Sequence, residues 1–341
     1  MTRIAVAGAG LIGTRHLDAL RLAGIPVHSV IDPDPSAADI AARHGVPHHA
    51  DLAAALATRP DGVILSTPNT HHRDGALACI AAGVPVLVEK PLAATVEDAR
   101  AIVAAGQAAG VPILTGHYRR HQGVVAAARE RIEAGALGTP VAAHAMFWIA
   151  KPDGYFDTAW RRAPGAGPLL VNLIHDLDLL RFLLGEVESV RAIASNRVRG
   201  FENEDHATAL IAFDSGVICT AQVSDAIVAP WSWEMTSHDN PAYPPTDQNA
   251  LWIGGTHGSL ALPRGELWDD GGRRDWMTPI RRETLTRATP DPLVAQARNF
   301  ADVIAGRAAP VCSGAEGLAT LAALDALIRA TRSGGVERPT P

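Results

Sequence analysis

The feature that most constrains this chain is a glycine-rich turn near its N-terminus. Residues 8–13 read GAGLIG; they follow the apolar run IAVA and open a segment with the periodicity of an amphipathic helix. In that context the glycines allow a tight turn, close approach of the backbone to a pyrophosphate, and close packing of the helix on the strand. The helix N-terminus adds N–H groups and a partial positive charge. We therefore expect a dinucleotide to contact Gly8, Gly10, Leu11, Ile12 and Gly13.

An acidic residue stands where such a site needs one. Asp32 lies 19 residues after Gly13, at the end of the second expected strand. A carboxylate there accepts hydrogen bonds from the adenine ribose and repels a 2′-phosphate. Asp34 adds negative charge, and the next arginine is Arg43. The sequence thus favours NAD over NADP; a glycine-rich turn serving another ligand is the alternative.

Aromatic residues divide the chain in two. The first is Tyr118, and all seven tryptophans lie at or after Trp148. A shift of this kind indicates two domains with different cores, and a chain of 341 residues is long enough for both. We expect an NAD-binding domain over residues 1–122 and a substrate-binding and oligomerisation domain over residues 123–341.

Short apolar runs alternate with helix-length segments in the first domain. Strands are expected near residues 3–8, 26–31, 62–67, 85–89 and 112–116, and helices over 12–23, 36–44, 50–58, 72–82 and 95–109. This alternation predicts right-handed crossovers and a doubly wound parallel sheet, the α/β Rossmann architecture.

The pattern changes after residue 122 to that of an α+β domain with an open, mostly antiparallel sheet. Helices are expected at 123–134, 170–184, 291–306 and 315–331, and strands at 140–149, 189–198, 207–213, 217–225 and near 250–268. Asp214-Ser215-Gly216 between two alternating runs predicts a hairpin, and His257 in GGTHGS is interpreted as a turn residue of another.

Charge and cysteine content exclude several classes of protein. The net charge is −6 without a basic stripe, which argues against nucleic acid and acidic membrane surfaces as partners. Three widely separated cysteines argue against a disulfide framework or a zinc site, so no metal is expected. The N-terminus has no leader pattern and the chain no apolar stretch of spanning length. We expect a cytoplasmic enzyme that acts on a small molecule.

Polar residues follow two further strands at the same edge of the expected sheet. Ser66, Thr67, Pro68, Asn69 and His72 lie in the loop after GVILST, where such sheets bind ligands, and they are expected to border the nicotinamide ribose. A plain surface loop with solvated histidines is the alternative.

Glu89-Lys90-Pro91 ends the next strand and carries one of only two lysines, the other being Lys151, among 30 basic residues. GAGLIG, TPNTHH, EKP and a later HDLD together resemble the glucose-fructose oxidoreductase/inositol dehydrogenase (Gfo/Idh/MocA) family over almost the whole chain. The resemblance implies that Lys90 meets the substrate hydroxyl or carbonyl and that Pro91 fixes the backbone for the nicotinamide. Glu89 and Lys90 would then also border the cofactor. A structural salt-bridge lysine is the alternative.

The HDLD segment supplies the second implied catalytic group, His175. The family pattern resembles an Asp four residues before this histidine and another three after it; His175 and Asp178 match, but the first Asp position holds Val171 with Asn172 beside it. Without that carboxylate, two alternatives are open. Either His175 and Lys90 transfer the proton alone, or Asn172 holds the substrate or orients His175. We expect Asn172 and Asp176 to contact substrate, and Asp178 to be structural; a core histidine is the alternative for His175.

Aromatic and basic residues lie in two further segments. Tyr118 and Arg119 follow the last parallel strand, and Tyr155, Trp160 and Arg161 precede the GAGP turn. Aromatic faces and fixed donors suit a polyhydroxylated ring or a carboxylate, so these five are candidate substrate contacts, with purely structural roles as the alternative.

The combined interpretation is an NAD-dependent dehydrogenase that oxidises a secondary hydroxyl of a sugar, polyol or cyclic diol, with proton transfer by Lys90 and His175. Three alternatives remain open: an oxidoreductase that recycles a bound nicotinamide internally, a reductase of an imine or conjugated double bond, and a non-catalytic NAD-sensing protein. The resemblance also implies a homodimer or homotetramer, because the second-domain sheets of this family commonly pair face to face.

Overall fold

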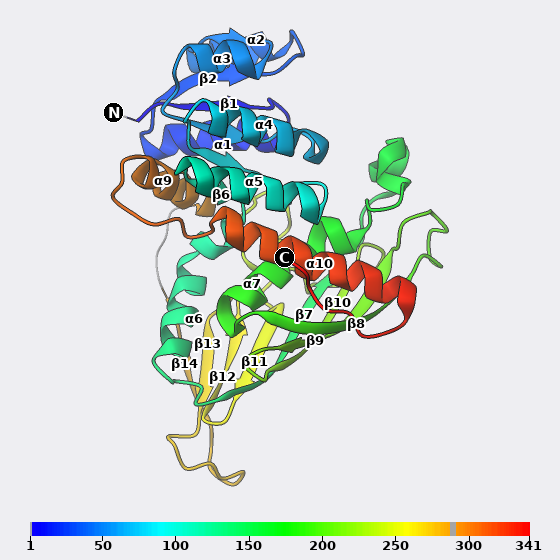
Figure 1. Cartoon of the computed structure of the whole chain (residues 1–341). Coiled ribbons are helices and arrows are strands. Elements are labelled where there is room, and N and C mark those ends of the chain that lie inside the picture. The colour runs from blue at the N-terminus through cyan, green and yellow to red at the C-terminus, as the bar shows by residue number, and fades with distance from the viewer. Residues whose placement is uncertain (1, 287–290) are drawn as a thin grey trace. The chain divides into compact units, whose positions relative to one another are not determined.

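The computed structural model describes residues 2–286 and 291–341, and the chain forms two compact units. Unit 1 runs to Gln122 and takes in a later segment that ends at Leu321, whereas unit 2 begins at Gly123 and includes Ala322–Thr340. Each unit has its own sheet (Figure 1) and its own hydrophobic core.

Unit 1 is built on six parallel strands in the order β3-β2-β1-β4-β5-β6. The strands are β1 (Ile4–Ala7), β2 (Val27–Ile31), β3 (His48–His49), β4 (Gly62–Leu65), β5 (Val86–Val88) and β6 (Ile113–Thr115). The order reverses between β1 and β4, and ligands of such sheets bind at the carboxyl ends of the strands at this switch point. The expected doubly wound sheet is confirmed; the short β3 was not predicted.

The helices of unit 1 occupy the segments where the sequence predicts them. They are α1 (Leu11–Ala23), α2 (Ala37–His44), α3 (Leu52–Ala57), α4 (His72–Ala81), α5 (Val96–Ala109) and α9 (Pro292–Ile304), with the start of α10 (Gly314–Ser333). Asp51 and Thr95 accept backbone N–H groups at the starts of α3 and α5, and Gly24, Gly45 and Gly110 end α1, α2 and α5 in the left-handed conformation. These caps explain why the segments begin and end where they do.

Within the described residues, the hydrophobic core of unit 1 is aliphatic apart from one phenyl ring. Its strands and helices contribute residues such as Ile4, Leu20 and Leu87, and the buried aromatic is Phe300 of α9. A Cβ on Gly62 of β4 would lie 3.0 Å from the Phe300 ring, so this helix packs directly on the sheet. The helix expected near 291–306 thus belongs to the same unit as the glycine turn.

Unit 2 is built on an eight-stranded sheet in the order β14-β13-β12-β11-β7-β10-β9-β8. Its strands are β7 (Pro140–Trp148), β8 (Val187–Ser195), β9 (His206–Phe213), β10 (Ile218–Ser224), β11 (Leu251–Gly255), β12 (Gly258–Leu262), β13 (Glu266–Asp269) and β14 (Arg281–Thr284). Among the described strands of this sheet, only β7 and β10 pair in parallel. The open, mostly antiparallel sheet and the hairpin at residues 214–216 are confirmed, and His257 lies between the antiparallel strands β11 and β12.

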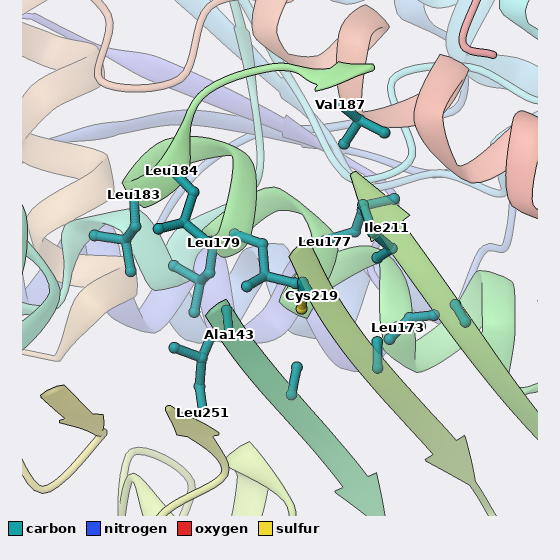
Figure 2. Packing of buried hydrophobic residues seen from close by; sticks show 14 of the residues in the cluster. Ala143, Leu173, Leu177, Leu179, Leu183, Leu184, Val187, Ile211, Cys219 and Leu251 are labelled. Atoms are coloured by element: carbon teal, nitrogen blue, oxygen red, sulfur yellow. The ribbon is translucent and has the colours of Figure 1, made fainter. Parts of the chain in front are cut away.

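Helices cover one face of the unit 2 sheet. They are α6 (Gly123–Glu133), α7 (Ile174–Leu184), the short α8 (Trp233–Thr236) and the later part of α10. Leu177 and Leu179 of α7 pack over Ala143, Ile211 and Cys219 of the strands (Figure 2). Within the described ranges, 2–286 and 291–341, no helix is long and apolar enough to cross a membrane.

Candidate active site

Two glycines of the unit 1 turn, Gly8 and Gly13, have no space for a Cβ atom. Gly8 has φ +91°, and a Cβ on it would lie 2.6 Å from the carbonyl oxygen of Ser66. A Cβ on Gly13 would lie 1.8 Å from the carbonyl oxygen of Gly8. Gly10, in contrast, has open space around it and precedes the first turn of α1. The turn therefore brings the backbone close to β4 and leaves room at the start of the helix.

The N-terminus of α1 is arranged to receive an anion. Gly10 has no side chain to cap the helix, and the first turn carries no acidic residue. The first N–H groups of a helix lack partners within it, and they favour negative charge. Leu11 at this end is 86% exposed, whereas Ile12 packs toward Ala19 and Leu293.

Asp32 lies beside the same turn. Its Oδ2 accepts the N–H of Ala9 at 2.7 Å and its Oδ1 accepts the N–H of Asp34 at 2.9 Å. A carboxylate oxygen accepts more than one hydrogen bond, so both oxygens keep capacity for ribose hydroxyls. Hydrogen bonds from Ser36 hold the pKa of the Asp34 carboxyl below its usual value, which adds a second negative charge. These residues fit NAD and disfavour a 2′-phosphate.

The loop after β4 is tied to its neighbours on both sides. The Ser66 hydroxyl lies 2.8 Å from the carbonyl oxygen of Ala7 and 3.0 Å from that of Gly8. His72 is fully buried, with its ring between the carbonyl oxygens of Thr67, at 2.9 Å, and Pro91, at 2.8 Å. Burial lowers the pKa of His72, and the two carbonyl contacts oppose this. His72 thus links this loop to EKP, while Pro68 lies exposed and Asn69 half-buried on it.

The EKP segment follows β5 and rests on a buried pair that the sequence did not reveal. His16 Nε2 of α1 lies 2.7 Å from Glu89 Oε1, and Glu89 Oε2 accepts the backbone N–H of Lys90 at 3.1 Å. Burial acts to raise the pKa of the Glu89 carboxyl, but His16 and Lys90 outweigh it and the pKa is lowered. Glu89 therefore fixes the Lys90 backbone. The Lys90-Pro91 peptide is cis, and the Lys90 residue is half-buried. The only signal for His16 was its place three residues after Gly13.

Tyr118 and Arg119 begin a short 3-10 helix after β6, Tyr118–His121. Tyr118 packs beside Leu293 and Val294 of α9, and Arg119 is almost fully buried. The neighbouring Arg120 forms a 2.8 Å ion pair with Glu316. This segment is thus anchored within unit 1, and almost none of Arg119 is exposed to solvent.

In unit 2, the helix expected over 170–184 begins differently from the prediction. Leu169–Leu173 forms one π-helical turn, and α7 starts only at Ile174. Glu204 Oε1 accepts the N–H of Leu169 at 3.0 Å and so caps this segment, and burial raises the pKa of Glu204. Because the turn is widened, the α-helical spacing of Asn172 and His175 does not describe it; π-turns within helices often accompany functional sites.

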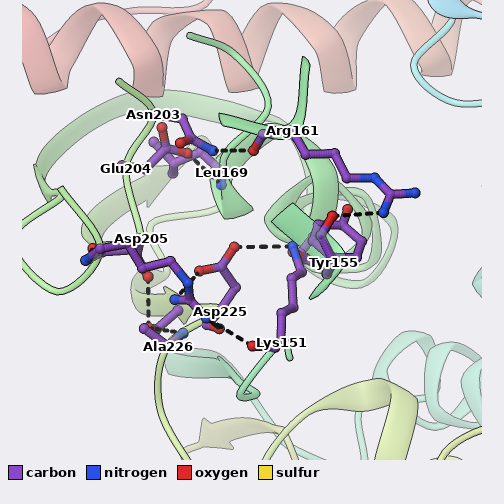
Figure 3. A network of polar contacts seen from close by, with 12 residues as sticks. Lys151, Tyr155, Arg161, Leu169, Asn203, Glu204, Asp205, Asp225 and Ala226 are labelled. Carbon is purple, nitrogen blue, oxygen red and sulfur yellow. Dashed lines mark hydrogen bonds and ion pairs between the residues drawn. The ribbon is translucent and has the colours of Figure 1, made fainter. Parts of the chain in front are cut away.

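The predicted residues of this segment differ in exposure. His175, Asp176 and Asp178 are buried at the start of α7. Asn172 is half-buried, and its Oδ1 accepts a hydrogen bond from Lys151 Nζ at 3.1 Å. The same ammonium lies 3.2 Å from Asp225 Oδ2 (Figure 3). Sequence reasoning singled out neither Lys151 as a site residue nor Asp225; the rarity of lysine was the one available signal.

Tyr155, Trp160 and Arg161 form a stacked group. The Arg161 guanidinium carbon lies 4.2 Å from the centre of the Tyr155 ring and 5.5 Å from that of Trp160. Its Nη1 donates to the carbonyl oxygen of Tyr155 at 2.8 Å, and Asn203 donates to the Arg161 carbonyl at 3.1 Å (Figure 3). The structure therefore brings these three candidates together around a fixed guanidinium.

A cavity of about 300 Å³ lies in unit 2. The residues that line it include Gly165, Leu169, Leu170, Ser195, Asn203 and Glu204. It borders the π-turn, but neither Asn172 nor His175 is part of its lining.

Comparison with known proteins agrees with this geometry. An oxidoreductase family model with an NAD-binding Rossmann fold matches residues 2–117, and the Gfo/Idh/MocA C-terminal domain matches residues 125–261. A 1,5-anhydro-D-fructose reductase of Ensifer adhaerens is 32% identical, over 80% of this chain and 78% of its own. An inositol 2-dehydrogenase of Saccharopolyspora erythraea is 31% identical, over 65% of this chain and 66% of its own.

A solved structure shares the architecture of the chain. The WlbA dehydrogenase of Bordetella pertussis, crystallised with NADH and UDP-GlcNAcA, is 26% identical with a TM-score of 0.79, over 99% of this chain and 98% of its own. The parallel sheet, the glycine turn and the neighbouring Asp32 carboxylate, with this match, define an oxidoreductase whose cofactor is NAD. The chain belongs to the Gfo/Idh/MocA family.

Proposed function

We propose that this protein is a cytoplasmic NAD-dependent dehydrogenase that oxidises a secondary hydroxyl of a sugar, polyol or cyclic diol. The observation that carries the proposal is Lys90: the buried His16–Glu89 pair holds its backbone at the carboxyl end of β5, in the unit that carries the glycine turn and Asp32. Two relatives named for a cyclic anhydrosugar and for inositol support the substrate class.

Residues 1–122 hold the cofactor in this proposal. Asp32 accepts the ribose hydroxyls, and the N–H groups at the start of α1 meet the pyrophosphate. The Ser66–Asn69 loop and EKP border the nicotinamide half, with His72 acting indirectly by joining the two. When bound, NAD supplies the hydride acceptor.

Residues 123–341 supply most of the groups that act on the substrate, together with Lys90, Tyr118 and Arg119 of residues 1–122. Lys90 takes the hydroxyl proton, and His175 assists as the second proton-transfer group. Asn172, Asp176, Tyr155, Trp160 and Arg161 bind and orient the hydroxylated ring, and Tyr118 and Arg119 complete the contacts from residues 1–122. A lysine serves at position 90 because an arginine stays protonated in proteins.

The experiment that tests this function follows nicotinamide reduction by the purified protein. The panel comprises polyols, aldoses, anhydrosugars and cyclic diols, each with NAD and NADP in parallel. Reduction of NAD by one of these classes supports the proposal. Reduction of none, with nicotinamide already bound to the protein, would contradict it and favour internal recycling or a reductase.

We propose in addition that the protein is a homodimer or homotetramer. Ile193, Leu210 and Ile218 are 76%, 48% and 56% exposed on adjacent strands of the unit 2 sheet, on the face opposite its helices. A second copy pairing on this face would bury them. Light scattering during gel filtration tests it: Leu210→Lys should lower the measured mass, and a monomeric parent protein would contradict the proposal.

A further inference from the structure

Lys151 constrains its neighbour Asn172 through simple donor chemistry. An ammonium donates hydrogen bonds and accepts none, so Asn172 must present its Oδ1 to the Nζ that lies 3.1 Å away. The oxygen and nitrogen ends of a carboxamide are otherwise hard to tell apart, and the hydrogen-bond partner decides which end is which. Here the decision leaves the Nδ2 amide on the side away from Lys151.

The ammonium itself is held by a rigid surround. β7 and β10 are parallel neighbours with Trp148 opposite Ser224, and this register carries Lys151 and Asp225 to the same place beyond the strands. The backbone N–H of Lys151 donates to the carbonyl of Asp225 at 2.9 Å. The Lys151 and Asp225 side chains are only 12% and 2% exposed.

Arg199 binds the Lys151–Asp225 pair from the other side. Its Nη1 lies 3.2 Å from Asp225 Oδ1, and its Nη2 donates to the carbonyl oxygens of Lys151, at 3.0 Å, and Asp225, at 2.8 Å. The guanidinium carbon also lies 4.4 Å from the centre of the Phe156 ring. Both carboxylate oxygens of Asp225 are therefore engaged, and the Lys151 ammonium has one well-defined position.

We propose that Lys151 is a positioning residue for the dehydrogenase reaction: it holds the Asn172 carboxamide so that Nδ2 donates to an oxygen of the substrate. The inference rests on the proposed function and adds a specificity element to it. An amide N–H₂ recognises an oxygen lone pair, whether of a hydroxyl, a ring ether or a carbonyl. A substrate analogue that lacks this oxygen would leave the donor unpaired and be rejected.

The test is a double-mutant cycle with Lys151→Met, Asn172→Leu and the double variant, using the best substrate of the panel. Lys151→Met keeps the length of the side chain and removes the charge, and Asn172→Leu keeps the shape and leaves the Lys151–Asp225 pair intact. Each single change should lower kcat/KM by about 10- to 100-fold, the range for a charge-assisted hydrogen bond. The double variant should lose no more than either single variant, because Lys151 acts through Asn172.

Two measurements separate positioning from a merely structural role. The affinity for NAD, from fluorescence titration, should stay unchanged in all variants. Arg181→Met removes another buried cation of unit 2, which pairs with Glu186 at 2.5 Å; it should lower the free energy of unfolding with less than about a tenfold change in kcat/KM. If Lys151→Met does not fold, Lys151→Gln replaces it in the cycle.

The outcomes distinguish this inference from the proposed function. An active parent protein whose two losses multiply in the double variant would overturn the inference alone, as would full activity in folded Lys151→Met. Coupling in the free energy of unfolding but none in kcat/KM would also overturn it, because the hydrogen bond would then be structural only. A parent protein inactive with the whole panel would overturn both.

Discussion

The candidate site of unit 1 is built mainly from backbone groups, whereas that of unit 2 is built from side chains. In unit 1 the site consists of a glycine turn, a helix N-terminus and Asp32, which all lie within one strand-helix-strand segment, and Asp32 contacts backbone N–H groups of that segment. In unit 2 Lys151 meets Asn172 across 21 residues and Asp225 across 74, through side chains. A backbone-built site depends on local spacing, whereas a side-chain-built site depends on how distant strands pair.

The comparison is sharpened most by Lys90, the side chain of unit 1 to which the proposed function assigns proton transfer. Lys90→Arg should reduce kcat by about 10³-fold, within the range for loss of a general base, because arginine does not release its proton. NAD affinity should be retained, since the backbone around residue 90 is held by Glu89. Steady-state kinetics and a binding titration measure both quantities.

Arg73→Lys is the matched control, since it exchanges the same two residue types on the surface of unit 1, where Arg73 pairs with Asp98. It should keep its activity. Substantial turnover by Lys90→Arg would show that residue 90 is structural, and the two units would then differ less than we infer.

The same contrast decides what could be read from the sequence. GAGLIG and Asp32 were predictable, because the turn, the following helix and the acid lie within about 25 residues and each has a local physical reason. The Lys151–Asp225 contact was not, because it requires β7 and β10 to be neighbours, and nothing in either strand specifies that. The π-turn at Leu169–Leu173 was missed because apolar spacing of this length reads as an ordinary α-helix. Phe300 shows the same limit for the core, since α9 packs into unit 1 from far along the chain.

A pair of glycine substitutions tests whether unit 1 is the less tolerant site. Gly13→Ala places a Cβ 1.8 Å from the backbone oxygen of Gly8, which has no freedom to move, and should destabilise unit 1 by about 3 kcal/mol with loss of NAD binding. Gly167→Ala places its Cβ 2.2 Å from the carboxyl group of Glu204, a side chain that rotates away, and should cost about 1 kcal/mol through the lost bond to Leu169.

Urea unfolding and NAD titration measure these effects. Gly10→Ala is the control for unit 1, because its Cβ meets no atom within 4 Å and its stability should be unchanged. Equal losses for Gly13→Ala and Gly167→Ala would contradict the distinction between the two sites.

Two cysteines report on the units separately. Cys79 of α4 and Cys219 of β10 are both buried, and burial raises the pKa of each thiol to about 12. Since the thiolate is the reactive form, labelling at pH 8 requires local or global opening. NAD at about 100 times its dissociation constant stabilises the protein that binds it by about 2.7 kcal/mol, so labelling of Cys79 should slow about 100-fold while that of Cys219 changes little.

Mass spectrometry of the labelled peptides identifies each thiol. A low urea concentration that keeps the protein native brings the rates into a measurable range. Equal protection of Cys79 and Cys219 by NAD would show that the units open together. Unit 1 and unit 2 would then differ in how their sites are built but not in how NAD changes their stability.

The smallest expected effect is an opposite response of two buried carboxylates to acid. In unit 1 the pKa of Glu89 is lowered in the folded state, so its contribution to stability is present above the ordinary glutamate value and is lost as the pH falls through the folded value. In unit 2 burial raises the pKa of Glu204, so the folded state binds its proton more tightly than the unfolded state does. Acidification from neutral pH through that raised value therefore increases the contribution of Glu204 to stability.

All seven tryptophans lie in unit 2, so tryptophan fluorescence follows that unit during urea unfolding, and Cys79 labelling follows unit 1. Glu89→Gln should weaken the acid-induced loss in unit 1, and Glu204→Gln should remove the acid-induced gain in unit 2. Parallel pH profiles of the two units in the parent protein would contradict the opposite responses of the Glu89 and Glu204 carboxyls.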